Sequence, residues 1–540
     1  MSHVHSGQTL ESTVPFFVGV IGHRQLREEE IPRLQQEFDS HIKSLLGSLK
    51  LTKIIVLTGN AEGADRIPQA SQYREHFSIC AVLPFAREEY VKDFPSQNQR
   101  VAFEESLNQS DYIVVTPNAP AGEVATSARD KAYQECARWI SDNSNLLIGF
   151  WDGLEPRGIG GTSDTVSYRT SEVYTKTFVH ESESGFLHIK ASNGERNFKE
   201  NCSCAGHKSV TARHVKFLDE LDNLNGYIEQ SEPASENDQL KLFFNKFDTS
   251  ASTLQTRFNR RTVSLFACAF LTLQFAFIQQ QRFSLLWLSL SALAMTITIT
   301  LWWSLWRLRI KSAYETLRFV AELLRIQIWW NECGVKMNAF YDNVEYHDIR
   351  DSTYSLLKNV FLYAKISQPE IEHVITQAAR ESSENPESQW IEGQIRYLTG
   401  SKTKVGAIER NRIAARRGLI FMALSLVFAG TLQVFSTASS LLNIIEPGSL
   451  LDWALKLVFP FLLSIAASVA AYAKLMGYKE VKILYDLKLR RLEIALAQLH
   501  TLDPKEDSAP IVKSVGSASL TESLRWFQLK GDREIRPFQT

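Results

Sequence analysis

Three glycine-rich segments in the first third of the chain carry side chains that could bind a phosphate group. The candidate ligand-binding residues are Gly22, His23 and Arg24 in the first segment, Gly59, Glu62, Gly63, Asp65 and Arg66 in the second, and Asp152, Gly160, Gly161 and Thr162 in the third. Glycine lets backbone N–H groups approach a phosphate, a helix N-terminus adds partial positive charge, and arginine supplies charge-assisted hydrogen bonds. One such segment alone is typical of an ordinary turn, so its meaning depends on whether the fold brings all three together.

The elements around these segments predict an α/β fold. Apolar runs rich in β-branched residues occur at 16–21, 53–57, 78–83, 112–116 and 146–150, with helical patterns between them, for example at 29–46 and 97–109. Short apolar strands that alternate with helices indicate a Rossmann-like parallel sheet covered on both faces. Ligands of such sheets bind beyond the carboxyl ends of the strands, which is where all three segments fall. We therefore expect one ligand site at one edge of the sheet.

Motifs and composition disfavour several other functions. The chain contains neither a GxxxxGK[ST] phosphate loop nor a GxGxxG dinucleotide fingerprint, so ATP or NAD binding of those two kinds is not supported. Its net charge of −1 argues against a general nucleic-acid-binding protein. The six cysteines are scattered, as in a protein of a reducing compartment.

One cysteine cluster has part of the pattern of a zinc site. Cys202 and Cys204 are followed by His207, but the only candidate fourth ligand, His214, lies beyond the usual spacing of roughly three to five residues. We expect a loop with free thiols here, no metal ion and no bound cofactor.

The glycine-rich segments also carry a family pattern. The first strand followed by GHR, the sequence TGNAEGADR after the second, AVLPF at 81–85, and IGFWDG followed by GIGGT occur in this order. In this respect residues 14–175 resemble the SLOG superfamily, which includes the LOG-type phosphoribohydrolases and the DprA-like proteins. The resemblance implies that the loops bind a nucleotide or a nucleotide-derived molecule. It carries over to Gly22, Arg24, Gly59, Gly63, Asp65, Gly160, Gly161 and Thr162.

The chain departs from the hydrolytic members of that family at one motif. LOG-type enzymes have PGGxGTxxE, in which the Glu works with an Arg on an N-glycosidic bond. The corresponding stretch here has no PGG and no Glu after Thr162, and its nearest carboxylate, Asp164, comes one residue too early. The departure favours a binding protein over an enzyme, and we assign no catalytic residue.

The second half of the chain contains four long charge-free stretches, at 262–281, 283–306, 418–445 and 457–473. About 20 apolar residues in a helix cross the ~30 Å hydrocarbon core of a bilayer. The stretches therefore predict an all-α membrane domain of four transmembrane helices, arranged as two hairpins. The alternative is a set of helices buried in a large soluble core. Few ionisable groups lie within the stretches, which disfavours an ion or proton relay.

Basic residues at the ends of these stretches predict their orientation. They are Arg257, Arg260, Arg261, Arg307, Arg309 and Lys311 around the first pair, and Arg410, Arg412, Arg416, Arg417, Lys474, Lys479 and Lys482 around the second. Lys and Arg mark the cytoplasmic side of a membrane span. We expect a multi-pass inner-membrane protein whose N-terminal domain, connector and C-terminus are cytoplasmic, with cytoplasmic helices at 314–330 and 481–499.

The chain is expected to divide into six parts. These are a flexible tail at 1–13, the SLOG-like domain at 14–235, a first transmembrane hairpin with its cytoplasmic helix at 236–334, a connector at 335–410, a second hairpin with its helix at 411–500, and a C-terminal tail at 501–540.

The membrane half resembles the SLOG-associated (SLATT-like) transmembrane effectors of bacterial defence systems. This resemblance implies an antiphage membrane effector whose partners are a nucleotide-derived second messenger (a cyclic nucleotide or an ADP-ribose type), an enzyme that makes it, the lipid bilayer and further copies of the chain, with no nucleic acid. Signal binding would make the protein oligomerise or open and disrupt the inner membrane. Two alternatives remain: a membrane-anchored nucleotide N-glycosidase or phosphoribohydrolase, and a ligand-regulated channel.

Overall fold

The computed structural model describes residues 13–120, 125–155, 159–171, 185–194, 197, 212–230, 238–281, 284–307, 309–344, 351–367, 386–401, 403–442, 445–446, 449–503 and 506–531. The predicted tail before residue 13 lies outside this range, as do Cys202, Cys204, His207 and the side chain of His214. The chain forms two compact units, one of Met1–Phe247 with Phe340–Ile375 and one of Asp248–Ala339 with Thr376–Thr540.

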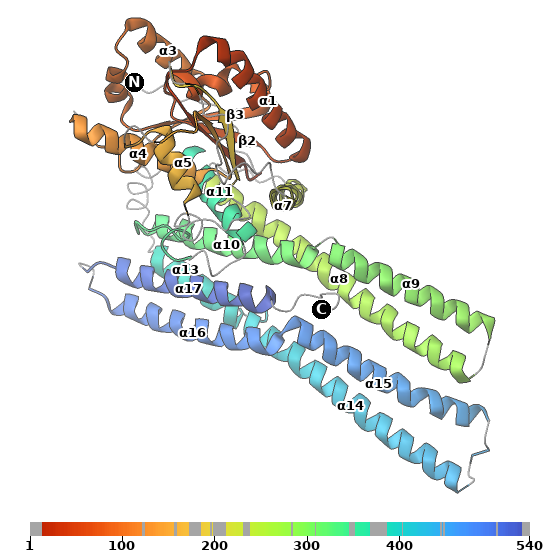
Figure 1. Cartoon of the computed structure of the whole chain (residues 1–540). Helices are drawn as coiled ribbons and strands as arrows, with labels where there is room; N and C mark the ends of the chain where they lie inside the picture. The colour runs from red at the N-terminus through yellow and green to blue at the C-terminus, as the bar shows by residue number, and fades with distance from the viewer. Residues whose placement is uncertain are drawn as a thin grey trace. The chain divides into compact units, whose positions relative to one another are not determined.

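The first unit is built on a six-stranded parallel sheet in the order β4-β3-β2-β1-β5-β6, which confirms the predicted parallel sheet (Figure 1). The strands are β1 (Phe16–Gly22), β2 (Ile54–Thr58), β3 (Phe77–Leu83), β4 (Tyr112–Val115), β5 (Leu146–Trp151) and β6 (Gly185–Lys190). β2, β3 and β5 are buried along their whole length, as their continuous apolar sequences require. The sequence does not predict β6, because it is an edge strand in which buried and half-buried residues are mixed.

Helices cover both faces of this sheet. They include α1 (Ile31–Ser48), α2 (Arg87–Tyr90), α3 (Gln97–Asn108), α4 (Thr126–Asn143), α5 (Thr162–Thr170) and α7 (Ala212–Glu229). α1 buries Leu34, Phe38, Ile42 and Leu45, which recur at helical spacing on one side. The chain moves outward from β1 to β4 and then returns through α4 to β5, on the other side of β1. Since crossovers are right-handed, this reversal puts α4 on the opposite face from α1 (Figure 1).

One helix from far along the sequence completes the first unit. α11 (Asp351–Ser367) lies at the amino ends of the strands, where the side-chain amide of Asn359 donates to Pro15 O and to Asn145 Oδ1, both at 2.9 Å. Lys358 Nζ donates to Asp142 O at 3.1 Å. The sequence predicts only a connector for this segment, and its packing on the sheet unit is seen in the structure alone.

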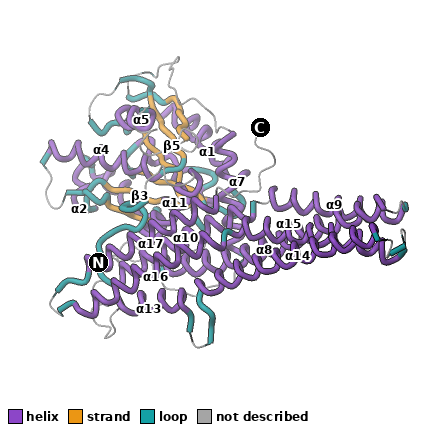
Figure 2. Tube along the Cα trace, turned by 90° about the horizontal axis from the view of Figure 1, so that it is seen from below, coloured by secondary structure: helices purple, strands orange, loops and turns teal. Residues whose placement is uncertain are grey.

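The second unit is helical, and the described strands all belong to the first unit (Figure 2). Its helices are α8 (Gln239–Gln281), α9 (Leu285–Arg307), α10 (Ile310–Glu332), α13 (Pro386–Thr399), α14 (Ala407–Leu441), α15 (Leu450–Met476), α16 (Tyr478–Thr501) and α17 (Ala509–Gly531). The start of α8, at 239–247, belongs to the first unit and the rest to the second. α10 and α16 cover the two helices expected at 314–330 and 481–499.

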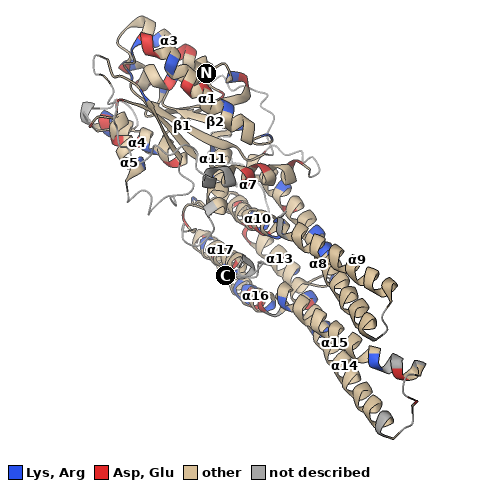
Figure 3. Ribbon diagram, turned by 45° about the vertical axis from the view of Figure 1, so that its right-hand side comes forward, with Lys and Arg blue, Asp and Glu red and all other residues tan. Residues whose placement is uncertain are grey.

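Four helices of the chain are long and apolar enough to cross a membrane, by length and composition. Their apolar segments lie in α8, α9, α14 and α15, where Figure 3 shows long stretches without charged residues. Only 6 to 11% of the residues in the most apolar windows are buried within the structure. This exposure does not fit helices enclosed in a soluble core.

Candidate functional site

The candidate site lies where the strand order reverses. β1 is flanked by β2 on one side and by β5 on the other, and the chain leaves β1 and β5 toward opposite faces of the sheet. In open parallel sheets, ligands bind beyond the carboxyl ends of the strands at such a switch point. The loops after β1, β2 and β5, which carry the predicted site residues, all start at this edge.

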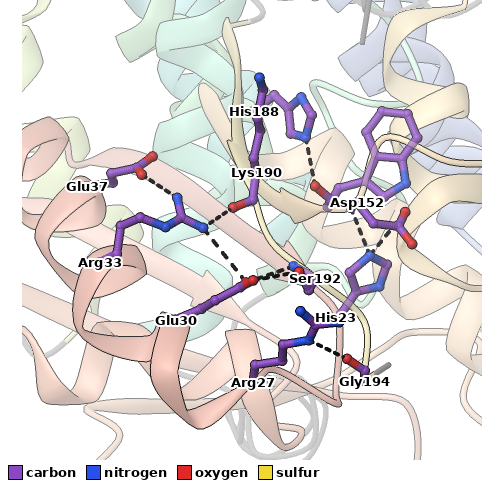
Figure 4. Close-up of polar contacts among 11 residues, drawn as sticks. His23, Arg27, Glu30, Arg33, Glu37, Asp152, His188, Lys190, Ser192 and Gly194 are labelled. Atoms are coloured by element: carbon purple, nitrogen blue, oxygen red, sulfur yellow. Dashed lines mark hydrogen bonds and ion pairs between the residues drawn. The ribbon is translucent and has the colours of Figure 1, made fainter. Parts of the chain in front are cut away.

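The loops after β1 and β5 are joined by His23 and Asp152, both buried (Figure 4). The backbone N–H of Asp152 donates to His23 Nε2 at 3.0 Å, and Asp152 Oδ1 lies 3.4 Å from the same nitrogen. Asp152 Oδ1 also accepts the N–H of Leu154 at 3.1 Å. A ring nitrogen that accepts an amide proton belongs to neutral histidine with its proton on Nδ1. The pair therefore holds two loops in place at the switch point.

The loop after β2 packs directly against the loop after β1. Gly63 has a φ of +74°, and a Cβ there would stand 2.4 Å from the carbonyl oxygens of both His23 and Arg24. A Cβ on Gly22 would stand 2.3 Å from that of Ala64, whose N–H donates to His23 O at 3.1 Å. Gly63 requires glycine because its left-handed backbone meets the carbonyls of the other loop, and Gly22 requires it because Ala64 and Phe150 leave no space for a side chain. These glycines thus set the shape of the site.

Asp65 is the carboxylate at the centre of the second loop. Its Oδ2 accepts the N–H of Ala61 at 3.2 Å, and a Cβ on Gly59 would approach this oxygen to 2.8 Å. Burial raises the pKa of Asp65 to about 6, although the Ala61 hydrogen bond and the charges of Arg24 and Arg66 act in the opposite direction. The site therefore contains one carboxyl group that titrates near neutrality between two arginines.

The two arginines differ in their surroundings. The guanidinium of Arg24 lies over the ring of Tyr133, 4.7 Å from its centroid, and its side chain is exposed. Arg66 is half-buried, and its buried Nε and Nη2 have no hydrogen-bond partner among the described residues. Buried donors of this kind call for an acceptor. A bound anion would supply one.

Two tyrosines at the site are not predicted by the sequence. Tyr133, from α4, donates its hydroxyl to Asp93, and Tyr90, from α2, donates to Gly59 O at 3.3 Å. Burial raises the pKa of Tyr133 to about 12, with the nearby Arg24 acting in the opposite direction. The two rings lie 6.1 Å apart. Neither tyrosine belongs to a loop motif, and an isolated aromatic residue on a helix resembles any core residue in sequence.

Gly160, Gly161 and Thr162 form the start of α5 and pack on α4. Gly160 has a φ of +78°, and a Cβ there would lie 2.8 Å from the backbone N of Gln134. The carboxylate of Asp164 accepts the Gly160 N–H at 3.1 Å and the Gln134 side-chain amide at 2.7 Å. At this helix N-terminus the N–H of Gly160 thus donates its hydrogen bond to Asp164, a carboxylate of the chain itself. These hydrogen bonds connect the segment to α4 and not to Arg24 or Arg66.

The arrangement is suited to holding an anion. Arg24, Asp65, Arg66 and the backbone of the β2 loop lie together. Glu62, at the start of the short helix Gly63–Ala70, is half-buried, and within the described part of the chain its side chain forms no ion pair with the two arginines. Among the described residues, no three or more His, Cys, Asp and Glu side chains are placed to hold a metal ion. The chemistry available is therefore charge-assisted hydrogen bonding, with Asp65 as a titratable neighbour.

No protein-family model, curated protein or solved structure matches this chain. The class that the fold defines is a doubly wound α/β unit joined to a helical unit with four long apolar helices.

Proposed function

We propose that the chain is a membrane protein whose sheet unit binds a nucleotide-derived, phosphate-bearing ligand and whose apolar helices respond to it. The observation that carries the proposal is the meeting of the β1 and β2 loops at the switch point, with Arg24 and Arg66 beside the half-buried Asp65. Both arginines can form charge-assisted hydrogen bonds to phosphate oxygens, and Arg66 has buried donors available for them.

In this proposal the four apolar helices cross the inner membrane as two hairpins, α8 with α9 and α14 with α15. Three observations support the pairing of α8 with α9, the exposure of the helices and the orientation. α8 and α9 meet in reverse order, through Arg261 with Ser304 at 3.2 Å and Phe275 with Trp287 at 6.0 Å between centroids. Large apolar side chains such as Leu285, 75% exposed, face outward. Basic residues stand at the predicted cytoplasmic ends.

A physical connection supports a response of the helices to the sheet unit. α8 begins in the sheet unit, where Phe243 packs on Tyr363 of α11, with ring centroids 5.9 Å apart. Tyr363 also meets Tyr112 of β4, with 3.4 Å between the hydroxyls. The same continuous helix supplies the first apolar segment. The ligand site lies at the opposite, carboxyl edge, so in this proposal a rearrangement that passes through the sheet to its amino edge acts on the helix that leads into the proposed membrane span.

The biological role we propose follows the resemblance to SLOG and SLATT-like proteins. A partner enzyme makes the second messenger during phage infection, and binding makes copies of the chain associate or open and disrupt the membrane. The ligand must bind the active arrangement more tightly than the resting one, and a shift from 1:99 to 99:1 needs about 5.5 kcal/mol of differential affinity. Association between copies can contribute part of that free energy.

A thermal-shift screen of the full chain in detergent tests the binding step. The probes are cyclic mononucleotides, cyclic dinucleotides and ADP-ribose. A ligand at 100 times its Kd adds about 2.7 kcal/mol to the free energy of unfolding. We expect one class of probe to raise the Tm of the wild type but not of a variant with Arg24→Ala and Arg66→Ala. A probe that stabilises both proteins equally would show that it binds elsewhere.

A second function, hydrolysis of a nucleotide, is favoured by one observation. Asp65, with a pKa of about 6, is suited to general acid–base chemistry near neutral pH, and Arg24 and Arg66 lie beside it. Incubating the full chain with the same probes would then release free base, and Asp65→Asn would abolish the release. If no base is released while a probe still stabilises the protein, the binding function stands alone.

A further inference from the structure

The surface between α8 and α9 contains an apolar crevice of about 310 Å³. Leu265, Phe266 and Ala269 line it from α8, and Thr298, Ile299 and Trp302 line it from α9. The only hydroxyl among these side chains, on Thr298, donates to Ala294 O in its own helix at 2.8 Å. The crevice therefore presents an apolar surface, because the hydroxyl of Thr298 is already hydrogen-bonded within its own helix.

Two polar contacts between α8 and α9 flank the crevice. At one end, Arg261 Nη1 of α8 donates to Ser304 Oγ of α9 at 3.2 Å. At the other end, the hydroxyls of Thr272 and Thr298 lie 3.4 Å apart. The helical rise from Arg261 to Thr272 is about 16 Å, close to half of the ~30 Å hydrocarbon core. The crevice lies between these contacts, and its lining on α8, from Leu265 to Ala269, covers about 6 Å of helical rise, about one turn.

Positive charge gathers at the Arg261 end. Arg257 stands one helical turn before Arg261, and neither has an ion-pair partner among the described residues. Like charges at i and i+4 on a helix repel each other. Their repulsion is relieved when an anion binds between them.

We propose that this crevice binds one acyl chain of an anionic phospholipid, whose phosphate is held by Arg261 and Arg257. The proposal rests on the membrane insertion proposed for α8 and α9. Arg261 lies one helical turn before this apolar crevice, so a basic group and an apolar surface stand where the phosphate and part of an acyl chain of such a lipid would lie. Anionic headgroups bind basic sites between transmembrane helices. The lipid would fill the gap between α8 and α9 and support their packing.

Native mass spectrometry of the full chain in detergent tests this site. The probes are phosphatidylglycerol, phosphatidylcholine and glycerol 3-phosphate. We expect one phosphatidylglycerol to bind per chain in preference to phosphatidylcholine, with no binding of glycerol 3-phosphate. Arg257→Gln with Arg261→Gln should weaken phosphatidylglycerol binding roughly tenfold or more, since hydrogen bonds to charged groups are lost. The matched control is Arg416→Gln with Arg417→Gln, which removes two exposed arginines of α14.

The outcomes distinguish a lipid site from diffuse charge attraction and from a dimer interface. Equal loss in both double variants would indicate diffuse attraction and overturn the site, and so would unchanged binding in the α8 variant. Ala269→Trp should fill the crevice and reduce binding of the lipid; if it instead dissociates a dimer and leaves lipid binding unchanged, a second copy occupies the crevice. Membrane fractionation of each protein is measured separately. A chain that does not fractionate with membranes contradicts the proposed function itself.

Discussion

At the scale of single residues, the candidate site depends on backbone proximity as much as on charge. Gly63 combines a left-handed backbone with a near contact to two carbonyl oxygens, and Gly22 leaves space for Ala64. The sequence identifies these glycines as possible phosphate contacts. The structure gives them a packing role, because they let the β1 and β2 loops touch.

Gly63→Ala should therefore destabilise the sheet unit. The new Cβ adds a strained φ and a clash with His23 O and Arg24 O, and we expect a loss of about 1–3 kcal/mol. Gly47→Ala in α1 is the control, because its Cβ meets nothing within 4 Å and alanine favours a helix. Thermal unfolding of the full chain in detergent compares them. Equal Tm values for the two variants would contradict the packing role of Gly63.

Asp65 predicts a pH dependence of stability. Its pKa is raised from the ordinary value of 3.8 to about 6 by burial, so between these pH values the folded state holds a proton that the unfolded state releases. The protonated carboxyl thus favours folding at pH below about 4, and this contribution is lost as the pH rises through 6, by up to about 3 kcal/mol. Relative to Asp65→Asn, the wild type should lose stability between about pH 4 and 7. Parallel pH profiles of the unfolding midpoint would rule this out.

At the scale of elements, the sequence predicts the strands and helices that have a local pattern of apolar residues. Five strands and the four apolar stretches follow from the sequence because continuous apolar runs are local signals. β6, α11 and α17 do not, since each is defined by distant partners. α11 packs through Asn359 on the ends of β1 and β5, and α17 through contacts with α10. The order of the glycine-rich loops predicts which edge of the sheet binds the ligand. Tyr90 and Tyr133 also lie at this edge, but they come from helices that carry no motif.

The packing of α17 on α10 can be tested at one position. Trp330 Nε1 donates to Val512 O at 3.3 Å, and a Cβ on Gly516 would lie 2.2 Å from the same nitrogen. Gly516→Ala should push the indole away and cost about 1–3 kcal/mol. Gly393→Ala in α13, where the Cβ meets nothing within 4 Å, should be neutral or slightly stabilising. If Gly516→Ala leaves the Tm unchanged, α17 does not pack on Trp330.

Partly buried charged side chains also connect the helices of the second unit. Arg318 of α10 pairs with Asp248 of α8 and lies 3.1 Å from Glu322, while Arg491 of α16 lies 3.0 Å from Glu522 of α17. Burial acts to raise the pKa of Glu322, but the surrounding cations, Arg325 first, hold it below its usual value. Removing one partner from such a cluster leaves other charges unpaired. Lys488 of α16 is one of the cations that lower the pKa of Glu322, so these charges connect α10 and α16, the helices that follow the two apolar pairs.

At the scale of the whole molecule, we propose that a ligand at the edge of the sheet changes the state of the membrane helices. α8 provides the covalent route, because it starts against α11 in the sheet unit and continues into an apolar segment. A ligand with equal affinity for both states would change nothing, so the site must bind the ligand more tightly in the active state of the helices.

The most direct measurement is dye release from liposomes that contain the full chain, with the probe identified by the thermal-shift screen. We predict that the probe releases dye with the wild type and that Arg24→Ala with Arg66→Ala abolishes release while insertion is unchanged. Lys43→Ala with Lys50→Ala, which removes two exposed charges at and just beyond the far end of α1, should behave as the wild type. Probe-dependent release that persists in the Arg24 and Arg66 variant would contradict the coupling of this site to the membrane helices.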